Sequence, residues 1–275
     1  MFKKQKPVTS SLRHRLSIVK SINKKPILKT KIVSHKKALG KGKDTGLIVS
    51  RHKEQGMKKK YRQLDFKRTS NSKGIVCSIE HDPYRSAFIM SIFDTLKKSF
   101  YYTLAVDNVK VGNILESGPK SAIRSGNSVP LEKVPAGTAV CNVSFYKNKG
   151  GQISRSAGTF CIVQGHLTSN FSCLELPSKE IRLIPSKNYV FVGKISNPLH
   201  FLETIGKAGR SRWLGNRPKV RGVAMNPVDH PNGGGEGKKS GFGRTPWGKP
   251  SKGGKKGLKF TFKKNLIIKK RYETG

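Results

Sequence analysis

The net charge of the chain constrains its folding more than any other feature. The 275 residues include 56 lysine and arginine residues against 15 aspartate and glutamate residues, a formal net charge of +41 at pH 7. Repulsion among so many like charges destabilises a compact state, so the chain needs a polyanionic partner. Nucleic acid fits this need best, because each neutralised phosphate releases condensed counterions. The charge therefore argues against a self-contained enzyme.

An anionic membrane surface is the alternative polyanion. No apolar run in the sequence approaches the ~18 residues of a membrane-spanning helix. No amphipathic helix with a Trp-rich or Leu-rich face is evident either. We therefore expect no membrane partner.

Charge divides the chain into three zones. Residues 1–70 hold 22 basic and 3 acidic residues, residues 71–200 hold 15 and 8, and residues 201–275 hold 19 and 4. The hydrophobic content of 35% is enough for a core, but not for one that spans the whole chain. We expect one or two domains in the middle zone and basic extensions at both ends.

The middle zone is predicted to be β throughout. Short runs rich in β-branched and aromatic residues fall into two groups separated by turn signals, a pattern typical of small sandwiches or barrels. The first group contains residues 74–80, 87–93 and 99–105, and the second contains residues 139–146, 158–163, 172–176, 180–184 and 189–193. The sequence therefore predicts two small β barrels that fold without RNA.

The last zone holds 15 of the 29 glycines and has no sustained helical or strand period. Such a segment buries too little apolar surface to offset its chain entropy. We expect residues 201–275 to be ordered only by a partner. Limited proteolysis of the free protein should then leave a core near residues 71–200.

The four cysteines, Cys77, Cys141, Cys161 and Cys173, form no C-x-x-C pair and have no histidine at zinc-finger spacing. Each falls in a stretch typical of strands, which favours buried thiols in a reducing compartment. The N-terminus lacks the apolar segment of a secretory signal. Its basic, serine-containing composition leaves an organellar transit peptide open.

Three basic segments are candidates for RNA contact. Residues 51–62 mix lysine and arginine with His52 and Tyr61, which can stack on unpaired bases. Residues 150–158 form a glycine-rich loop with one arginine, Arg155, which can grip a phosphate. Residues 206–221 interleave six basic residues with glycine and Trp213. The alternative interpretations are a solvated charged face and a plain hairpin loop.

Asp229 and His230 form a carboxylate–imidazole pair that suits a general base, but no nucleophile or oxyanion scaffold is apparent nearby. We instead expect His230 to shape RNA, with Asp229 fixing its ring tautomer. The glycines at 233–235 are expected to let the backbone lie against RNA. Residues 232–239 superficially resemble a phosphate-binding loop, but Asn232 and Lys239 replace the glycine and the hydroxyl residue that this motif needs.

Several long motifs resemble the universal L2 family of large-subunit ribosomal proteins. They are YRQLDFKR, IEHDPYRSA, ILESGP, KGGQISRSAGT, AGRSRWLGNRP and RGVAMNPVDHP, followed by GGGEG and TPWGKP, and they occur in order over roughly residues 50–250. The KPVTSSLRHR opening is also similar. The sequence departs from the family at Asn232, at residues 53–57 and between Gly237 and Thr245.

The resemblance implies an OB-like barrel followed by an SH3-like barrel, with long basic irregular extensions at both ends. The implied domains are a basic N-terminal extension (1–50), an OB-like RNA-binding barrel (51–122), an SH3-like barrel (123–200) and a glycine-rich C-terminal extension (201–275). The implied function is structural: binding of large-subunit rRNA near the peptidyl-transferase region, with support for its assembly and for subunit association.

We expect no catalytic residue, no protein-bound metal and no cofactor beyond structural magnesium ions held by the rRNA. The expected partners are large-subunit rRNA, neighbouring ribosomal proteins and the small subunit at the intersubunit face. The resemblance, the preference for lysine and the departures together indicate a mitochondrial ribosome, with the bacterial cytoplasm or a plastid as alternatives. Asp229, His230, Gly233, Gly234 and Gly235 are expected near the peptidyl-transferase region. The expected rRNA-binding residues are Arg51, His52, Lys53, Lys59, Lys60, Tyr61, Arg62, Lys67, Arg68, Arg155, Lys207, Arg210, Arg212, Trp213, Arg217, Arg221, Asn226, His230, Lys238 and Lys249.

Overall fold

A computed structural model of the chain describes residues 2–18, 22–34, 40–42, 44–146, 149–168, 170–235, 242–251 and 266–270. The chain divides into two compact units. Unit 1 contains Met1–Lys36, Lys59–Gly206 and Asn265–Gly275, and unit 2 contains Lys37–Lys58 and Lys207–Lys264. The basic segment 51–62 is therefore shared between the two units. Lys238 lies outside the described residues.

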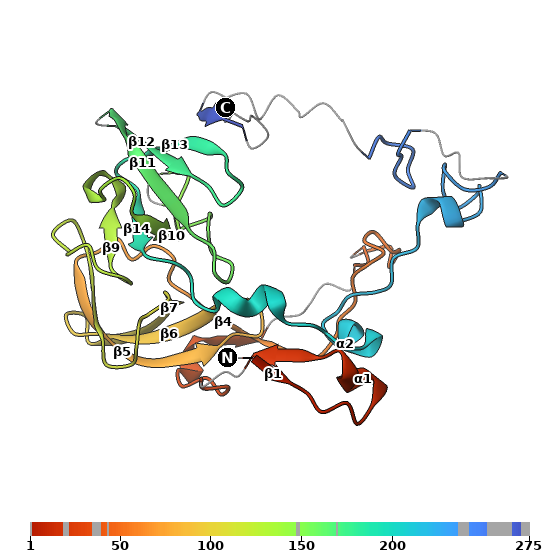
Figure 1. The fold of residues 1–275 in the computed structure, drawn as a ribbon, viewed down its shortest axis with the longest axis horizontal. Helices are drawn as coiled ribbons and strands as arrows, with labels where there is room; N and C mark the ends of the chain where they lie inside the picture. The colour runs from red at the N-terminus through yellow and green to blue at the C-terminus, as the bar shows by residue number, and fades with distance from the viewer. Residues whose placement is uncertain are drawn as a thin grey trace. The chain divides into compact units, whose positions relative to one another are not determined.

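The largest sheet among the described residues belongs to unit 1 and runs in the order β15-β13-β12-β11-β10-β14-β9-β8-β5-β6-β7 (Figure 1). Its strands are β5 (Ser72–His81), β6 (Phe88–Asp94), β7 (Ser99–Leu104), β8 (Ile114–Ser117), β9 (Ser128–Pro130), β10 (Ala139–Cys141), β11 (Cys161–Thr168), β12 (Phe171–Glu175), β13 (Ile181–Pro185), β14 (Tyr189–Val192) and β15 (Ile267–Lys269). The predicted mostly-β class is confirmed.

The first strand group, β5 to β8, forms an antiparallel barrel wall with one face buried. In β5 every second residue from Gly74 to Glu80 is buried, although Val76 is the one apolar side chain among these four. Side chains of successive residues point to opposite faces of a strand, so this pattern places one face on a core. The buried residues of this core include Val76, Met90, Ile92 and Leu104.

The second group, β9 to β14, encloses a separate core around Leu131, Val140, Val163, Leu174 and Ile184. The strands of both groups overlap the predicted runs, with the exception of β8 and β9. The run 139–146 is a strand only at Ala139–Cys141, and the run 158–163 begins before β11, which continues to Thr168. These two short strands pair in parallel at one position, Ser117 with Ser128, and thereby join the two barrels.

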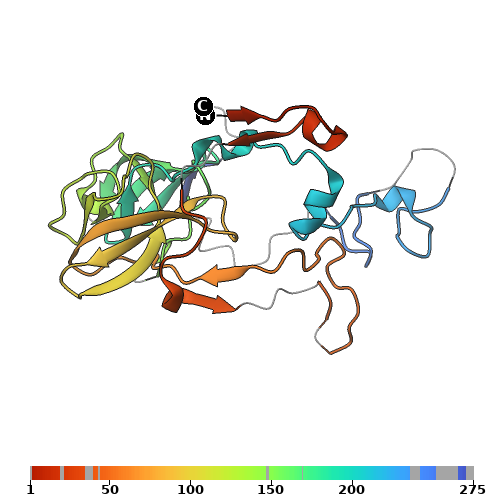
Figure 2. The ribbon, with the colours of Figure 1, turned by 90° about the horizontal axis from the view of Figure 1, so that it is seen from below.

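Short strands and helices complete the described chain (Figure 2). In unit 1, β1 pairs with β2 and β3 pairs with β4, both antiparallel. Their bounds, with those of the helices, are β1 (Phe2–Lys4), α1 (Ser10–Arg13), β2 (Leu16–Ile18), η1 (Lys29–Lys31), β3 (Ile32–Ser34), β4 (Lys60–Arg62), η2 (Leu131–Lys133), η3 (Pro198–Leu202), α2 (Ala208–Trp213) and η4 (Gly222–Ala224).

The expectation that residues 201–275 are ordered only by a partner is wrong for parts of this zone. In unit 2 the helices α2 and η4 form within the chain itself. In unit 1 the C-terminal strand β15 pairs with β13, and the Leu183 N–H donates to the Leu266 carbonyl at 2.7 Å. An edge strand offers unpaired backbone groups, so even a three-residue strand in a basic tail finds a partner there.

All four cysteines lie in strands and are free thiols, as predicted. Three of them are buried, and burial raises the pKa of Cys161 to about 11. Cys77 is exposed, so the expectation of burial is wrong for it. The described residues include no helix that is both long and apolar enough to cross a bilayer. Nor do they contain three His, Cys, Asp or Glu side chains grouped as metal ligands.

Candidate nucleic-acid interface

Unit 1 has a pocket of about 600 Å³ whose walls carry aromatic rings and arginines. The rings belong to Tyr61, Phe66 and Tyr84, and the guanidinium groups belong to Arg85 and Arg155. The remaining lining residues are Ser86, Gln152, Ser154, Ser156, Thr159 and Pro177. Aromatic faces stack on unpaired bases, and arginines pair with phosphates, so this combination suits single-stranded RNA.

The guanidinium groups lie over the rings. Arg155 lies 4.9 Å from the centroid of the Phe66 ring, and Arg85 lies 5.2 Å from that of Tyr61. The Tyr61 and Tyr84 rings meet edge to face at 5.5 Å. Cation–π contact holds both guanidinium groups beside the pocket. Both terminal nitrogens of Arg85 already have partners within the protein, Asp82 and the Tyr61 hydroxyl, so Arg155 is the better placed of the two arginines to meet a ligand.

The glycine-rich loop 150–158 is held against the first barrel. The Gly151 N–H donates to the Phe66 carbonyl at 3.2 Å, and the Ala157 N–H donates to the Ser86 hydroxyl at 3.1 Å. These two bonds fix both ends of the loop, so Arg155 is carried to the pocket by a supported backbone. The sequence showed the loop only as a weak signal, because its docking partners are distant in the chain.

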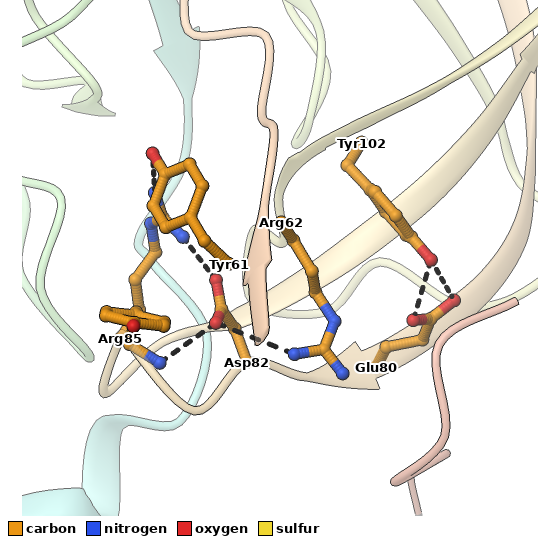
Figure 3. Close-up of polar contacts among 7 residues, drawn as sticks. Tyr61, Arg62, Glu80, Asp82, Arg85 and Tyr102 are labelled. Carbon is orange, nitrogen blue, oxygen red and sulfur yellow. Dashed lines mark hydrogen bonds and ion pairs between the residues drawn. The ribbon is translucent and has the colours of Figure 1, made fainter. Parts of the chain in front are cut away.

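The buried carboxylate of Asp82 anchors a pocket residue (Figure 3). Asp82 is fully buried and accepts a hydrogen bond from Arg85, whose other terminal nitrogen donates to the Tyr61 hydroxyl at 3.1 Å. Arg62, 4% exposed, lies 3.7 Å from the same carboxylate. Asp82 therefore orients one pocket arginine and neutralises a second, buried one.

Glu80 performs a similar task for the N-terminal segment. Its carboxylate accepts hydrogen bonds from the Tyr102 hydroxyl at 2.9 and 3.1 Å and from the Ile27 N–H at 3.3 Å. The Leu28 N–H donates to the Tyr102 hydroxyl at 2.9 Å. Burial, above all, raises the pKa of Tyr102 to about 12. The pair thus ties residues 27–28 to the first barrel.

The structure places most of the predicted RNA-contact residues at the surface. Eleven of them are exposed: Arg51, Lys53, Lys60, Lys67, Arg155, Lys207, Trp213, Arg217, Arg221, Asn226 and Lys249. Five are half-buried: His52, Lys59, Tyr61, Arg210 and Arg212. Phe66, Tyr84 and Arg85 were missing from the predicted set. Phe66 lies in one motif, and Tyr84 and Arg85 lie in another, so only the fold brings the three together. An arginine beside an aromatic residue is by itself a weak signal of RNA binding.

Arg62 and Arg68 are placed inside the protein and have structural partners. Arg68, 3% exposed, donates to the Gly126 carbonyl at 2.8 Å and lies over the Phe191 ring at 5.1 Å. Burial lowers the pKa of this arginine from its ordinary value. The side chain of Arg68 therefore stabilises the junction between the two barrels. We exclude Arg62 and Arg68 from the candidate interface.

His230 is buried in unit 2, where its ring packs on Gly222. Its Nδ1 accepts the backbone N–H of Asn232 at 3.0 Å, so the neutral ring carries its proton on Nε2. Asn232, and not the exposed Asp229, therefore fixes the tautomer, and the expectation for Asp229 is wrong. Gly233 and Gly234 pack closely on Asn226 and Pro227 of the same chain.

Gly235 has no neighbour within 4 Å of the position that a side chain would take. Gly234 and Gly235 are both exposed, whereas Gly233 is half-buried. The described part of this turn is therefore stabilised from within the protein, by His230 and by the close packing of Gly233 and Gly234.

Two family models match the chain. The model described as ribosomal proteins L2, RNA binding N-terminal domain, matches residues 29–117, and the model described as ribosomal proteins L2, C-terminal domain, matches residues 124–248. Together they cover most of the chain, and their junction coincides with the joint between the two barrels. The predicted OB-like barrel followed by an SH3-like barrel is thereby confirmed. The chain belongs to the ribosomal protein L2 family, and it is an RNA-binding structural protein of the ribosome.

Proposed function

We propose that the chain is a structural constituent of the large ribosomal subunit that binds large-subunit rRNA near the peptidyl-transferase region. In this role it supports assembly of that region and association of the two subunits. Neighbouring ribosomal proteins and, at the intersubunit face, the small subunit are the other partners. Magnesium ions belong to the rRNA in this proposal, not to the protein.

The observation that carries the proposal is the pocket of unit 1. A base that leaves its stack can lie against Tyr84, while Arg155 meets an adjoining phosphate. Arg85 supports the wall of the pocket through Asp82 and the Tyr61 hydroxyl. The two arginines are held on rings, so little side-chain entropy is lost when RNA binds. This pocket supplies local recognition that net charge alone does not.

The exposed basic residues of unit 2 supply the second part of the interface. Lys207, Arg221 and Lys249 can contact phosphates, and Trp213, half exposed, can stack on a base. His230 acts through the protein: its ring fixes the turn that carries the exposed Gly235, and it performs no proton transfer. We place the working ribosome in the mitochondrial matrix, with the bacterial cytoplasm or a plastid as alternatives.

Replacing Arg155 with glutamine tests the pocket. We expect this variant to bind a large-subunit rRNA fragment about 10–150-fold more weakly, because a hydrogen bond to a charged group contributes about 1.5–3 kcal/mol. Arg124→Gln is the matched control, since Arg124 is exposed in the same unit and does not line the pocket. Affinities are measured by filter binding at one salt concentration. Equal losses in the two variants would contradict a specific role for the pocket.

A further inference from the structure

Two segments of unit 2 that are distant in sequence are joined by backbone hydrogen bonds. The Glu54 N–H donates to the Gly215 carbonyl at 2.9 Å, and the Met57 N–H donates to the Trp213 carbonyl at 2.9 Å. In the reverse direction, the Arg217 N–H donates to the His52 carbonyl at 3.2 Å. We call residues 52–57 and 212–217 the clasp. It brings part of the first basic segment to α2.

Gly56 allows the close approach within the clasp. Its φ of +61° lies in the left-handed region, and a β-carbon there would lie 2.5 Å from the Trp213 carbonyl oxygen. Any other residue at position 56 would strain the backbone and push the two segments apart. Gly56 therefore specifies one side of the clasp.

The side chain of Glu54 joins the two segments of the clasp as well. Arg212 of α2 donates to it through two nitrogens, from Nε at 2.7 Å and from Nη2 at 2.9 Å. Arg217 approaches the same carboxylate, with Nη1 3.7 Å from Oε1. The pKa of Glu54 is lowered, first by the hydrogen bond from Arg212. Bidentate hydrogen bonding of this kind is the strong form of a carboxylate–guanidinium pair.

The ion pair between Glu54 and Arg212 determines which cationic side chains remain available to contact the phosphates of RNA. Two adjacent donors of Arg212 are occupied by Glu54, and the charges of the two groups cancel. Arg210 lies on the same helix, and among the described residues no carboxylate lies within ion-pair distance of it. Lys207 lies over the Trp213 ring at 4.6 Å and is exposed. The surface around α2 therefore presents Lys207 and Arg210 without a carboxylate partner, whereas Arg212, whose side chain is 42% exposed, is paired with Glu54.

We propose that Glu54 is a positioning residue that holds Arg212 in a structural role within the RNA-binding surface of unit 2. The phosphates of the RNA are then contacted by Arg210 and Lys207. This inference rests on the proposed function and refines it, because it removes Arg212 from the predicted phosphate contacts and gives it a structural role.

The salt dependence of RNA binding distinguishes an arginine that contacts a phosphate from one that has a structural role. Each phosphate contact contributes about 0.7–0.9 to the slope of log affinity against log salt. We expect Arg210→Gln to flatten this slope by that amount and Arg212→Gln to leave it unchanged. Glu54→Gln should steepen it by the same amount, because the released Arg212 becomes free to bind a phosphate. A Glu54→Gln, Arg212→Gln double variant should return the slope to the wild-type value.

The experiment uses the full-length protein and an in vitro transcript of large-subunit rRNA. Hydrogen exchange of the RNA-free protein reports the clasp itself, through the amides of Glu54 and Met57. These amides should lose protection in Glu54→Gln and regain it in the charge-swapped Glu54→Arg, Arg212→Glu variant. An Arg212→Gln slope as flat as that of Arg210→Gln, or no recovery of protection after the swap, would overturn the proposal. A flat wild-type slope would instead overturn the proposed function.

Discussion

Raising the salt concentration from 50 to 200 mM should weaken binding to large-subunit rRNA by about 10³–10⁵-fold. A protein that makes 6–10 phosphate contacts loses about this much affinity over that range, because counterions released into a more concentrated salt solution gain less entropy. The exposed cations spread over both units supply at least that many candidate contacts. Titration of a labelled rRNA fragment at several salt concentrations and constant magnesium measures the effect.

Circular dichroism of the protein at both salt concentrations is the control, since the comparison requires the same fold throughout. A fragment of double-stranded DNA of equal length separates general attraction to polyanions from recognition of the RNA. If the affinity for rRNA changed less than tenfold over this range, the charge of +41 would not be used on phosphates.

Replacing Asp82 with alanine should lower the free energy of unfolding of the RNA-free protein by about 3–5 kcal/mol. Asp82 is fully buried, and its removal leaves the guanidinium of Arg62 in a site that is only 4% exposed. The same change also releases Arg85, which loses its carboxylate partner beside the pocket. Typical domains have a total stability of about 5–15 kcal/mol, so this loss would be a large fraction of it. Urea unfolding of the full-length variant measures the loss.

A double variant tests the physical reason. In Arg62→Met, Asp82→Ala the buried cation is gone as well, so we expect the double variant to be more stable than Asp82→Ala alone. If the double variant instead lost the sum of the two single effects, the unpaired charge would not be the cause. A loss below about 1 kcal/mol in Asp82→Ala would show that Arg62 finds another partner.

The strands that the sequence predicted are those whose apolar residues recur with a clear period. In β6 a continuous apolar run reaches the core, and no distant partner is needed to recognise it. Strand β5 was recognised from its β-branched residues, although its buried face is Gly74, Val76, Ser78 and Glu80. The four-residue β8 and the three-residue β9 were missed because they lie next to the turn signals that separate the two strand groups. Strand β15 was missed for another reason: its conformation comes from the exposed edge of β13.

The candidate site was less predictable, because burial of a basic residue depends on partners elsewhere in the chain. Arg62 and Arg85 meet at Asp82, and Arg68 finds its acceptor at Gly126. The segment 51–62 was treated as one RNA-binding stretch, yet the structure divides it after Lys58, and Glu54 acts within the clasp. Composition indicated RNA as the partner. It did not show which cations face the protein.

Sedimentation of the native protein tests the central claim most directly. A native lysate of the source cells or their organelles is fractionated on a sucrose gradient, at a magnesium concentration low enough to separate the ribosomal subunits. The chain is then followed with an antibody. We predict that it sediments with the large subunit and remains there after gentle washing. Recovery in the free protein fraction, or with the small subunit alone, would contradict the account.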